Sequence, residues 1–236
     1  MPGPPRHVIW DWNGTLVDDF GLILEAASAC CEALRGAPID ADEYRTHFTR
    51  PVQAFYERVV GRPLSALEWE QVNQTFHQRY LDRLEDLVLV PTAAAALEGV
   101  RHLGISQSVL SMWQQASLVG VIDRLGIAEF FVAVRGKSGM DGGDDHKAEH
   151  LVSHLGDLEG AGVTVDPAEV LLVGDSLDDA AAAAAVGARC VLVEGGSHHS
   201  HHLATAGVPV VGSLVAALHV AGLPVAPDHQ RAATGQ

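Results

Sequence analysis

Lysine is almost missing from this 236-residue chain, which contains only Lys137 and Lys147. Lys and Arg together number 15 against 30 Asp and Glu, so the formal net charge is −15, and no Arg-rich stripe is present. A basic patch is the usual signature of nucleic-acid binding, so we expect no nucleic-acid partner. An acidic chain that binds an anion needs a bound cation or a few well-placed basic groups.

Cysteine and long apolar runs are also scarce. The three cysteines, Cys30, Cys31 and Cys190, have neither the spacing of a disulfide framework nor that of a zinc site. No apolar run approaches the length that spans a membrane, and residues 1–6 contain no apolar signal core. We therefore expect a cytoplasmic protein without a membrane partner.

Apolar residues make up 47% of the chain and charged residues only 19%, which indicates a globular protein with a sizeable core. Short β-rich runs recur at residues 8–10, 108–110, 131–134, 170–173, 190–193 and 208–211. Helix-like segments separate most of them, at residues 116–125, 147–160, 178–186, 199–206 and 213–221. This alternation predicts an α/β fold with a doubly wound parallel sheet.

Residues 20–90 interrupt this alternation. They contain no convincing strand but several amphipathic helical stretches, at residues 22–34, 51–60 and 64–87. Such a segment is either an inserted helical unit or a helical flank packed permanently on the sheet. Pro91 marks the expected return to the sheet, and residues 224–236, which are polar with two prolines, are expected to form a flexible tail.

A carboxylate ends the first apolar run. Asp11 directly follows residues 8–10, and Gly14 allows the backbone to turn sharply after it. This order places Asp11 at the carboxyl edge of the sheet, where open α/β sheets bind their ligands. An acid at the end of a strand is also a common turn former, so Asp11 alone does not establish a site.

The most informative segment is 170–179, Val-Leu-Leu-Val-Gly-Asp-Ser-Leu-Asp-Asp, in which a buried-strand pattern ends in Asp175. Asp178 and Asp179 follow it, and acids at the start of a helix also have a structural use because they favour the helix dipole. Carboxylates that converge on one spot repel one another unless a hard divalent cation binds there. The segment therefore indicates a metal site.

Four segments, in this order, resemble the motifs of the haloacid dehalogenase (HAD) superfamily of phosphatases and phosphotransferases. They are Asp11-Trp-Asn-Gly-Thr-Leu16, Ser111 after an apolar run, Lys147 at a helix start, and Gly174-Asp175-Ser176 with Asp179. The resemblance extends over the whole core and is closest to phosphoglycolate-phosphatase-like members. It implies a core domain of residues 1–18 and 91–223 and a helical cap domain of residues 19–90 that closes over the site.

The resemblance implies a catalytic role for three residues. Asp11 is the implied nucleophile, which attacks phosphorus to give an aspartyl-phosphate. Lys147 neutralises charge between this nucleophile and the phosphoryl group. Asn13 stands where the family has a second Asp that serves as general acid and base. An amide cannot transfer a proton, and the loss of a positioned acid or base typically lowers a rate by about a hundredfold to ten-thousandfold.

The implied ligand contacts are of two kinds. Mg2+ is the implied cofactor, with ligands from Asp11, the backbone carbonyl of Asn13, Asp175 and Asp179. The implied substrate contacts are the hydroxyls of Thr15 and Ser111 and, from the cap, Arg50. A hydroxyl at a strand end or helix start is as often structural, and most cap arginines are simply solvated or paired.

Asn13 leaves three alternatives open: a slow phosphatase, an enzyme whose leaving group needs no proton, and a non-catalytic phosphate binder. Asp18 and Asp19 follow closely, but the motif spacing points them toward the cap hinge. The run His198-His-Ser-His-His202 invites a metal hypothesis, yet no acid or cysteine completes a ligand set, so a solvated helix start is the better interpretation.

Other branches of the superfamily fit less well. Residues 19–90 lack the lysine that phosphonatases use, the intact Gly174-Asp175-Ser176 differs from dehalogenases, and Asn13 disfavours phosphomutases. We therefore expect a magnesium-dependent phosphatase that hydrolyses a small phosphorylated metabolite and acts as a monomer or weak dimer. The alternative is a catalytically impaired, phosphate-binding pseudoenzyme.

Overall fold

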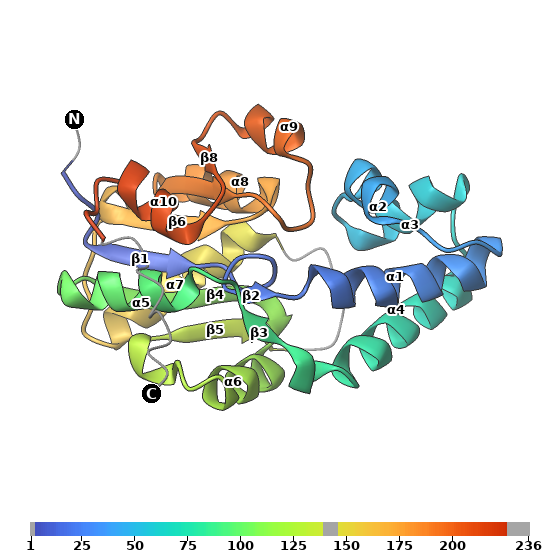
Figure 1. The fold of residues 1–236 in the computed structure, drawn as a ribbon, viewed down its shortest axis with the longest axis horizontal. Helices are drawn as coiled ribbons and strands as arrows, with labels where there is room; N and C mark the ends of the chain where they lie inside the picture. The colour runs from blue at the N-terminus through green and yellow to red at the C-terminus, as the bar shows by residue number, and fades with distance from the viewer. Residues whose placement is uncertain (1–2, 139–145, 226–236) are drawn as a thin grey trace, which may run out of the picture.

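The structure is a computed structural model, and it describes residues 3–138 and 146–225. A six-stranded parallel sheet forms its centre, with the strand order β5-β4-β1-β6-β7-β8 (Figure 1). The strands are β1 (His7–Trp10), β4 (Ser106–Gln114), β5 (Val134–Lys137), β6 (Val170–Gly174), β7 (Arg189–Val193) and β8 (Val210–Val211). In the register of β1, Trp10 lies opposite Val109 of β4 and Val173 of β6. The carboxyl ends of β1 and β6 therefore lie side by side.

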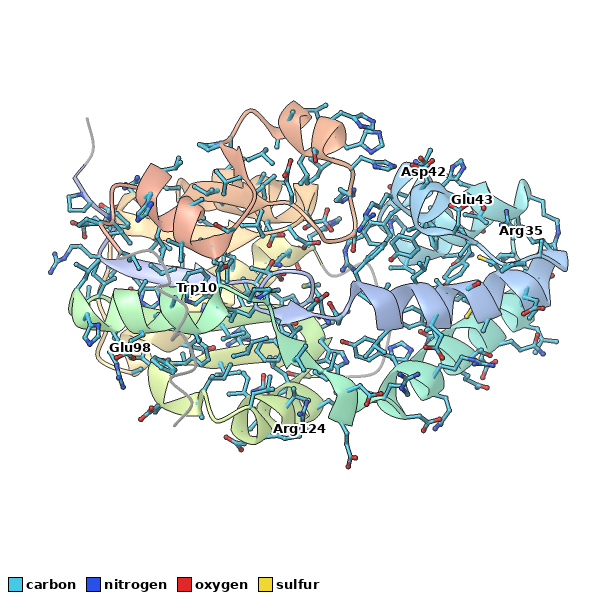
Figure 2. All side chains as sticks on the ribbon, viewed as in Figure 1. Trp10, Arg35, Asp42, Glu43, Glu98 and Arg124 are labelled. Atoms are coloured by element: carbon cyan, nitrogen blue, oxygen red, sulfur yellow. The ribbon has the colours of Figure 1, made fainter. Side chains whose placement is uncertain are left out.

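Helices cover both faces of this sheet. Val8 and Trp10 of β1 share one apolar core with α5 (Ala93–His102), α6 (Gln115–Arg124) and α10 (Leu214–Val220). Ile9 belongs to a second core, with α7 (Lys147–Gly160), α8 (Leu177–Val186) and α9 (Ser200–Leu203). Alternate residues of β1 thus face opposite layers, as a parallel sheet buried on both sides requires. Trp10 lies in the interior beside α5 (Figure 2). The predicted doubly wound α/β fold is confirmed.

The helical insert, residues 20–87, lies beyond the carboxyl ends of the strands (Figure 1). The chain enters it from β2 (Val17–Asp18) and leaves it into β3 (Val88–Leu89), and these two strands pair antiparallel. The helices of the insert are α1 (Phe20–Arg35), α2 (Ala41–His47), α3 (Val52–Val60) and α4 (Ala66–Leu81). Because entry and exit are paired, the insert is joined to the core at one place, in front of the strand ends.

The insert has an apolar core of its own. Cys30 of α1, Tyr56 of α3 and Val72 of α4 meet in it and are all buried. At the far end of α1, Arg35 donates from Nη2 to Oε2 of Glu43 in α2 at 2.8 Å, and both side chains are marked in Figure 2. The insert is therefore a packed unit rather than a set of helices held only by the sheet.

Several elements differ from the predicted ones. β5 begins at Val134 rather than at 131, because Phe131 closes the short 3-10 turn Ala128–Phe130. The helices α2 and α5 were not predicted, and β3 is a strand in a segment where we expected none. Two-residue strands and a seven-residue helix carry too little periodicity to be recognised in a sequence.

The end of the chain only partly meets expectation. Residues 226–236 of the predicted tail lie outside the described part of the chain. Val225, at the start of that tail, is buried, and its side chain fills the space that a Cβ on Gly99 of α5 would need. All three cysteines are buried and free. Among the described residues, no helix is both long and apolar enough to cross a membrane.

Candidate active site

Four charged side chains gather where β1 and β6 end. Asp11 follows β1, Asp175 follows β6, Lys147 begins α7, and Asp179 lies in the first turn of α8. Their relative exposures are 6%, 5%, 7% and 0%, respectively. The parallel register of β1 and β6 brings the first two acids to one edge, and the helices that follow β5 and β6 supply the other two groups.

Within this group, Lys147 is the centre of two ion pairs. Its Nζ contacts Oδ1 of Asp11 and, at 2.5 Å, Oδ1 of Asp179. Carboxylate oxygens of Asp11, Asp175 and Asp179 all lie within 4.8 Å of one another, the one such group of His, Cys, Asp or Glu that residues 3–138 and 146–225 contain. Three carboxylates face one ammonium group, so the ionised cluster carries an excess of negative charge.

Burial and charge shift the pKa values of this cluster. Burial raises the pKa of Asp11 to about 6, against the opposing effect of Lys147. Burial also raises the pKa of Asp175 well above its ordinary value, and the neighbouring Asp11 and Asp179 add to this shift. Burial alone would lower the pKa of Lys147, but Asp11 and Asp179 raise it, so this side chain stays a cation.

Glycines leave the room that the acids occupy. Gly14 has φ +69°, and a Cβ there would lie 2.7 Å from Oδ2 of Asp175. A Cβ on Gly174 would collide with the carboxyl group of Asp179, and one on Gly196 would collide with Asp175. The backbone can pass this close to the carboxylates only because these positions lack a side chain.

The cluster has the properties of a site for a hard divalent cation. Such ions prefer carboxylate and carbonyl oxygens, and the three buried acids offer them with more negative charge than Lys147 balances. Asp179 is already bonded through Oδ2 to Oγ of Ser176 at 2.6 Å and through Oδ1 to Lys147. Asp11 likewise contacts Lys147 through Oδ1.

The two hydroxyl groups are both buried but differ in their surroundings. Thr15 donates from Oγ1 to Oδ2 of Asp11 at 3.0 Å, so both carboxylate oxygens of Asp11 have a partner. We had expected Ser111 to end its strand, but β4 continues to Gln114. The pairing of β4 with β5 shifts register between Leu110 and Gln114, and Oγ of Ser111 accepts from N of Trp113 at 3.0 Å. Such an irregularity is a common way to re-aim a side chain.

Asn13 belongs to a network that the sequence did not reveal. Its Nδ2 donates to Oδ2 of Asp19 at 2.6 Å and to the hydroxyl of Tyr80 at 2.9 Å. Tyr80 in turn donates to Oδ2 of Asp19 at 2.7 Å, and N of Gly14 donates to Oδ1 at 2.8 Å. A carboxylate only accepts hydrogen bonds, so Asp19 fixes which end of the Asn13 amide faces it. Asp19 is fully buried, and burial raises its pKa.

The insert meets the core at the loop after β7 and at the start of α8. Arg50 pairs with Asp178 of α8 at 2.7 Å, and both side chains are about two-fifths exposed. Arg45 of α2 donates to the carbonyls of Gly195 and Gly196 at 3.1 and 3.0 Å. In the same loop, the ring of His198 lies 5.3 Å from that of Phe48. The histidine segment therefore contacts the insert. Between insert and core lies a cavity whose walls include Asp11, Asn13, Lys147 and Asp175.

Two curated proteins are similar to this chain over most of its length. A phosphoglycolate phosphatase of Chromobacterium violaceum is 28% identical over 194 residues, which cover 80% of this chain and 84% of that protein. A phosphoglycolate phosphatase of Synechococcus elongatus is 26% identical over 203 residues, covering 85% of this chain and 89% of that protein.

Solved structures show the same fold. A haloacid dehalogenase-like family hydrolase from Streptococcus pneumoniae superposes with a TM-score of 0.74 at 18% identity, covering 92% of this chain and 98% of that one. CbbY from Rhodobacter sphaeroides, solved in complex with phosphate, gives a TM-score of 0.68 at 19% identity and covers 91% of this chain and 99% of that one. The family model for haloacid dehalogenase-like hydrolases matches residues 5–187, a span that includes the whole acidic cluster. The chain therefore belongs to the haloacid dehalogenase-like hydrolases.

Proposed function

We propose that this hydrolase is a magnesium-dependent phosphatase that hydrolyses a small phosphorylated metabolite through an aspartyl-phosphate on Asp11. The observation that carries the proposal is the buried cluster of Asp11, Asp175 and Asp179 around Lys147, open to a cavity. The names of the two curated relatives given above, both phosphoglycolate phosphatases, support the reaction class. Mg2+ would be held by Asp11, Asp175 and the backbone carbonyl of Asn13, with Asp179 in support.

In the first step, a carboxylate oxygen of Asp11 forms a bond to phosphorus while the bond from phosphorus to the leaving-group oxygen breaks. Lys147 and Thr15 contact the two carboxylate oxygens and hold them in place for this attack. A bound Mg2+ would supply positive charge that reduces the repulsion between the carboxylates and the phosphoryl oxygens. Ser111 is the further proposed donor to these oxygens.

The fate of the protons depends on Asn13. The leaving-group oxygen departs with the bonding electron pair and takes its proton from solvent, because the Asn13 amide has no acidic proton to give. Water then attacks phosphorus in the aspartyl-phosphate, loses its proton to solvent, and releases inorganic phosphate with the Asp11 carboxylate restored. We propose that this enzyme is slow, or favours leaving groups that depart without protonation.

We further propose that the insert is a cap that selects the substrate, with Arg50 as one contact. Arg50 lies on the wall of the cavity, and its guanidinium carries five N–H donors, of which one pairs with Asp178 through Nε and others would donate to a substrate oxygen. The motif residues of the core, Asp11, Lys147 and Ser111, are assigned to the phosphoryl group, so the insert is the main proposed source of the choice among leaving groups.

The proposal is tested by replacing the nucleophile. Asp11→Asn should abolish hydrolysis of an aryl phosphate in the presence of Mg2+, and EDTA should abolish it reversibly in the wild type. Asp18→Asn is the matched control, since Asp18 is a nearby but exposed acid. Full activity in purified Asp11→Asn would refute the aspartyl-phosphate mechanism.

The same assay addresses the pseudoenzyme alternative, which the amide at Asn13 motivates. If the wild type hydrolyses no phosphate ester, phosphate binding is measured by calorimetry with and without Mg2+. Magnesium-dependent binding that Asp11→Asn abolishes would then identify a phosphate-binding protein.

A further inference from the structure

The cavity between insert and core has a volume of about 550 Å³. Its core side includes Asp11, Asn13, Lys147 and Asp175, the group to which we assign the phosphoryl end of a substrate. Sites for drug-sized ligands have volumes of about 300–1,000 Å³. The cavity is therefore much larger than a phosphoryl group with two carbon atoms attached requires.

Aromatic side chains dominate the rest of the wall. The chain has only four Trp, three Tyr and six Phe. Eight of them line this cavity: Tyr44, Phe48, Phe55, Tyr56, Trp69, Phe76, Tyr80 and Trp113. A chain with 6% aromatic residues has thus placed most of them, and every tyrosine, around one space.

Packing within the insert accounts for only part of this arrangement. Tyr44, Phe55 and Tyr56 are buried, and the ring of Phe55 contacts Tyr44 at a tilt and Tyr56 edge-on, so the three also form part of the core of the insert. Trp69 and Phe76 of α4 are only partly buried, although both line the cavity. Large apolar side chains left open toward a cavity bind apolar groups, since burying such a side chain fully gains about 1.5–3 kcal/mol.

Charge on the wall favours the same class of ligand. Arg50 is the sole Lys, Arg, Asp or Glu that the insert contributes to the wall, within the described part of the chain. Asp178, which also lines the cavity, pairs with Arg50 at 2.7 Å and compensates its charge. A leaving group that carries its own carboxylate, such as glycolate, would therefore meet, on the insert side, aromatic rings and an arginine already paired with Asp178, while the lysines of the wall, Lys137 and Lys147, belong to the core side.

We propose that the substrate is a phosphomonoester whose leaving group is apolar and at least as large as one aromatic ring. The phosphoryl group lies at Asp11, and the ring lies among Trp69, Phe76 and Trp113. Asn73 and His77, one turn apart on α4 and partly buried on the same wall, are the polar groups that would recognise a heteroatom on the ring. This assignment rests on the proposed phosphatase function, because it takes the acidic cluster as the phosphoryl end.

The test compares two alkyl phosphates that differ in the leaving group but not in its need for a proton. With Mg2+ present, KM for 2-phenylethyl phosphate should be at least about tenfold lower than KM for 2-phosphoglycolate, the ratio expected from burying one ring. Asn73→Trp fills the cavity and should raise KM for 2-phenylethyl phosphate by about tenfold or more. Leu67→Trp is the matched control, since Leu67 of the same helix is 64% exposed.

The outcomes separate the substrate class from the reaction. A lower KM for 2-phosphoglycolate, or an unchanged KM for 2-phenylethyl phosphate in Asn73→Trp, would overturn the apolar leaving group and leave the phosphatase intact. If no ester is hydrolysed, calorimetry with 2-phenylethylphosphonate takes the place of kinetics. Binding by wild type and Leu67→Trp but not by Asn73→Trp would then support the apolar site alone, and equal binding by all three would overturn it.

Discussion

At the scale of single residues, Asn13 and Asp19 form one unit. The amide of Asn13 donates to Asp19 and Tyr80, while Asp19 accepts from Asn13, Tyr80 and the backbone of Gly14. A single Asn13→Asp change would bring a second carboxylate to the position 2.6 Å from Oδ2 of Asp19. Two carboxylates at that distance cannot both be ionised, so the single variant is a poor test of the missing acid.

The informative variant exchanges the two side chains, Asn13→Asp with Asp19→Asn. The amide at position 19 would then donate to the carboxylate at position 13. The Tyr80 hydroxyl would accept from the amide at position 19 and donate to the carboxylate at position 13. Every hydrogen bond among the three side chains is therefore kept, with donor and acceptor positions exchanged. We expect turnover of 2-phenylethyl phosphate to rise by about a hundredfold or more, the usual effect of a positioned acid or base. Aryl phosphates should gain far less, because an aryl oxide leaves without protonation. A folded exchange variant with an unchanged alkyl-to-aryl ratio would show that another residue supplies the proton.

Asp175 provides a second prediction at this scale. Its carboxyl group is 5% exposed, accepts from N of Ser197 at 2.9 Å, and shares its surroundings with Asp11 and Asp179. In EDTA, Asp175→Asn should raise the free energy of unfolding by about 1–3 kcal/mol, because one poorly compensated buried charge is removed. Mg2+ should stabilise the wild type and leave this variant unchanged. Thermal unfolding with and without Mg2+ measures both effects, and a wild type that ignores Mg2+ would contradict the metal site.

At the scale of elements, a series of buried side-chain hydrogen bonds links β1, β4 and α7. His7 contacts Oγ of Ser106 and Ser108 at 2.7 and 2.8 Å, and Ser108 contacts Nε2 of His154 at 2.7 Å. The Ser108 hydroxyl lies between the two rings and has one proton to donate. The ring nitrogen that accepts this proton therefore carries none of its own. Burial lowers the pKa of His7 to about 3 and that of His154 to about 4.

These two histidines should make the fold sensitive to acid. An unfolded histidine takes up a proton near pH 6.5, whereas the native rings stay neutral down to about pH 3–4. Between these limits the unfolded state binds more protons, so stability is complete above pH 6.5 and falls as the pH falls, by up to about 1.4 kcal/mol per pH unit for each ring. His154→Gln should lower that slope by about 1 kcal/mol per unit in urea titrations from pH 5 to 6.5, whereas exposed His201→Gln should not. An unaltered slope in His154→Gln would exclude this residue as the cause.

The order of the elements along the chain also explains which parts of the fold and of the site could be predicted from the sequence. The doubly wound parallel sheet follows from apolar runs separated by helices, and α7 occupies residues 147–160 as predicted because a Gly/Asp-rich stretch of sequence precedes an apolar stripe of helical period. Asp11 and Asp175 could be found because each directly follows a buried strand. Tyr80 could not, since it lies 67 positions from Asn13 along the chain and meets it only when the insert folds back. β5 was misplaced because aromatic residues 130–131 suggest a strand, whereas the sheet pairs the weaker segment Val134–Lys137.

At the scale of the whole molecule, insert and core are linked by the paired strands β2 and β3 and by side-chain contacts beyond them. Tyr80 accepts from Asn13, Arg124 of α6 donates to backbone carbonyls of the insert, and Arg45 and Arg50 contact the loop after β7 and the start of α8. Among these contacts, the Arg50–Asp178 pair is ionic and lies on the cavity wall, so it contributes to the charge there.

The last prediction concerns the charge of this ion pair. A half-exposed ion pair contributes only about 0–1 kcal/mol to stability, so Asp178→Asn should leave the melting temperature nearly unchanged. It should, however, leave the positive charge of Arg50 uncompensated on the cavity wall. We expect KM for 2-phosphoglycolate to fall about threefold to tenfold at low salt, because its carboxylate gains a partner, while KM for 2-phenylethyl phosphate stays the same. Asp123→Asn on α6 changes the net charge equally away from the cavity and serves as the control. A fall in KM for both substrates would mean that the pair limits access rather than selecting charge, and no change for either would remove Arg50 from substrate selection.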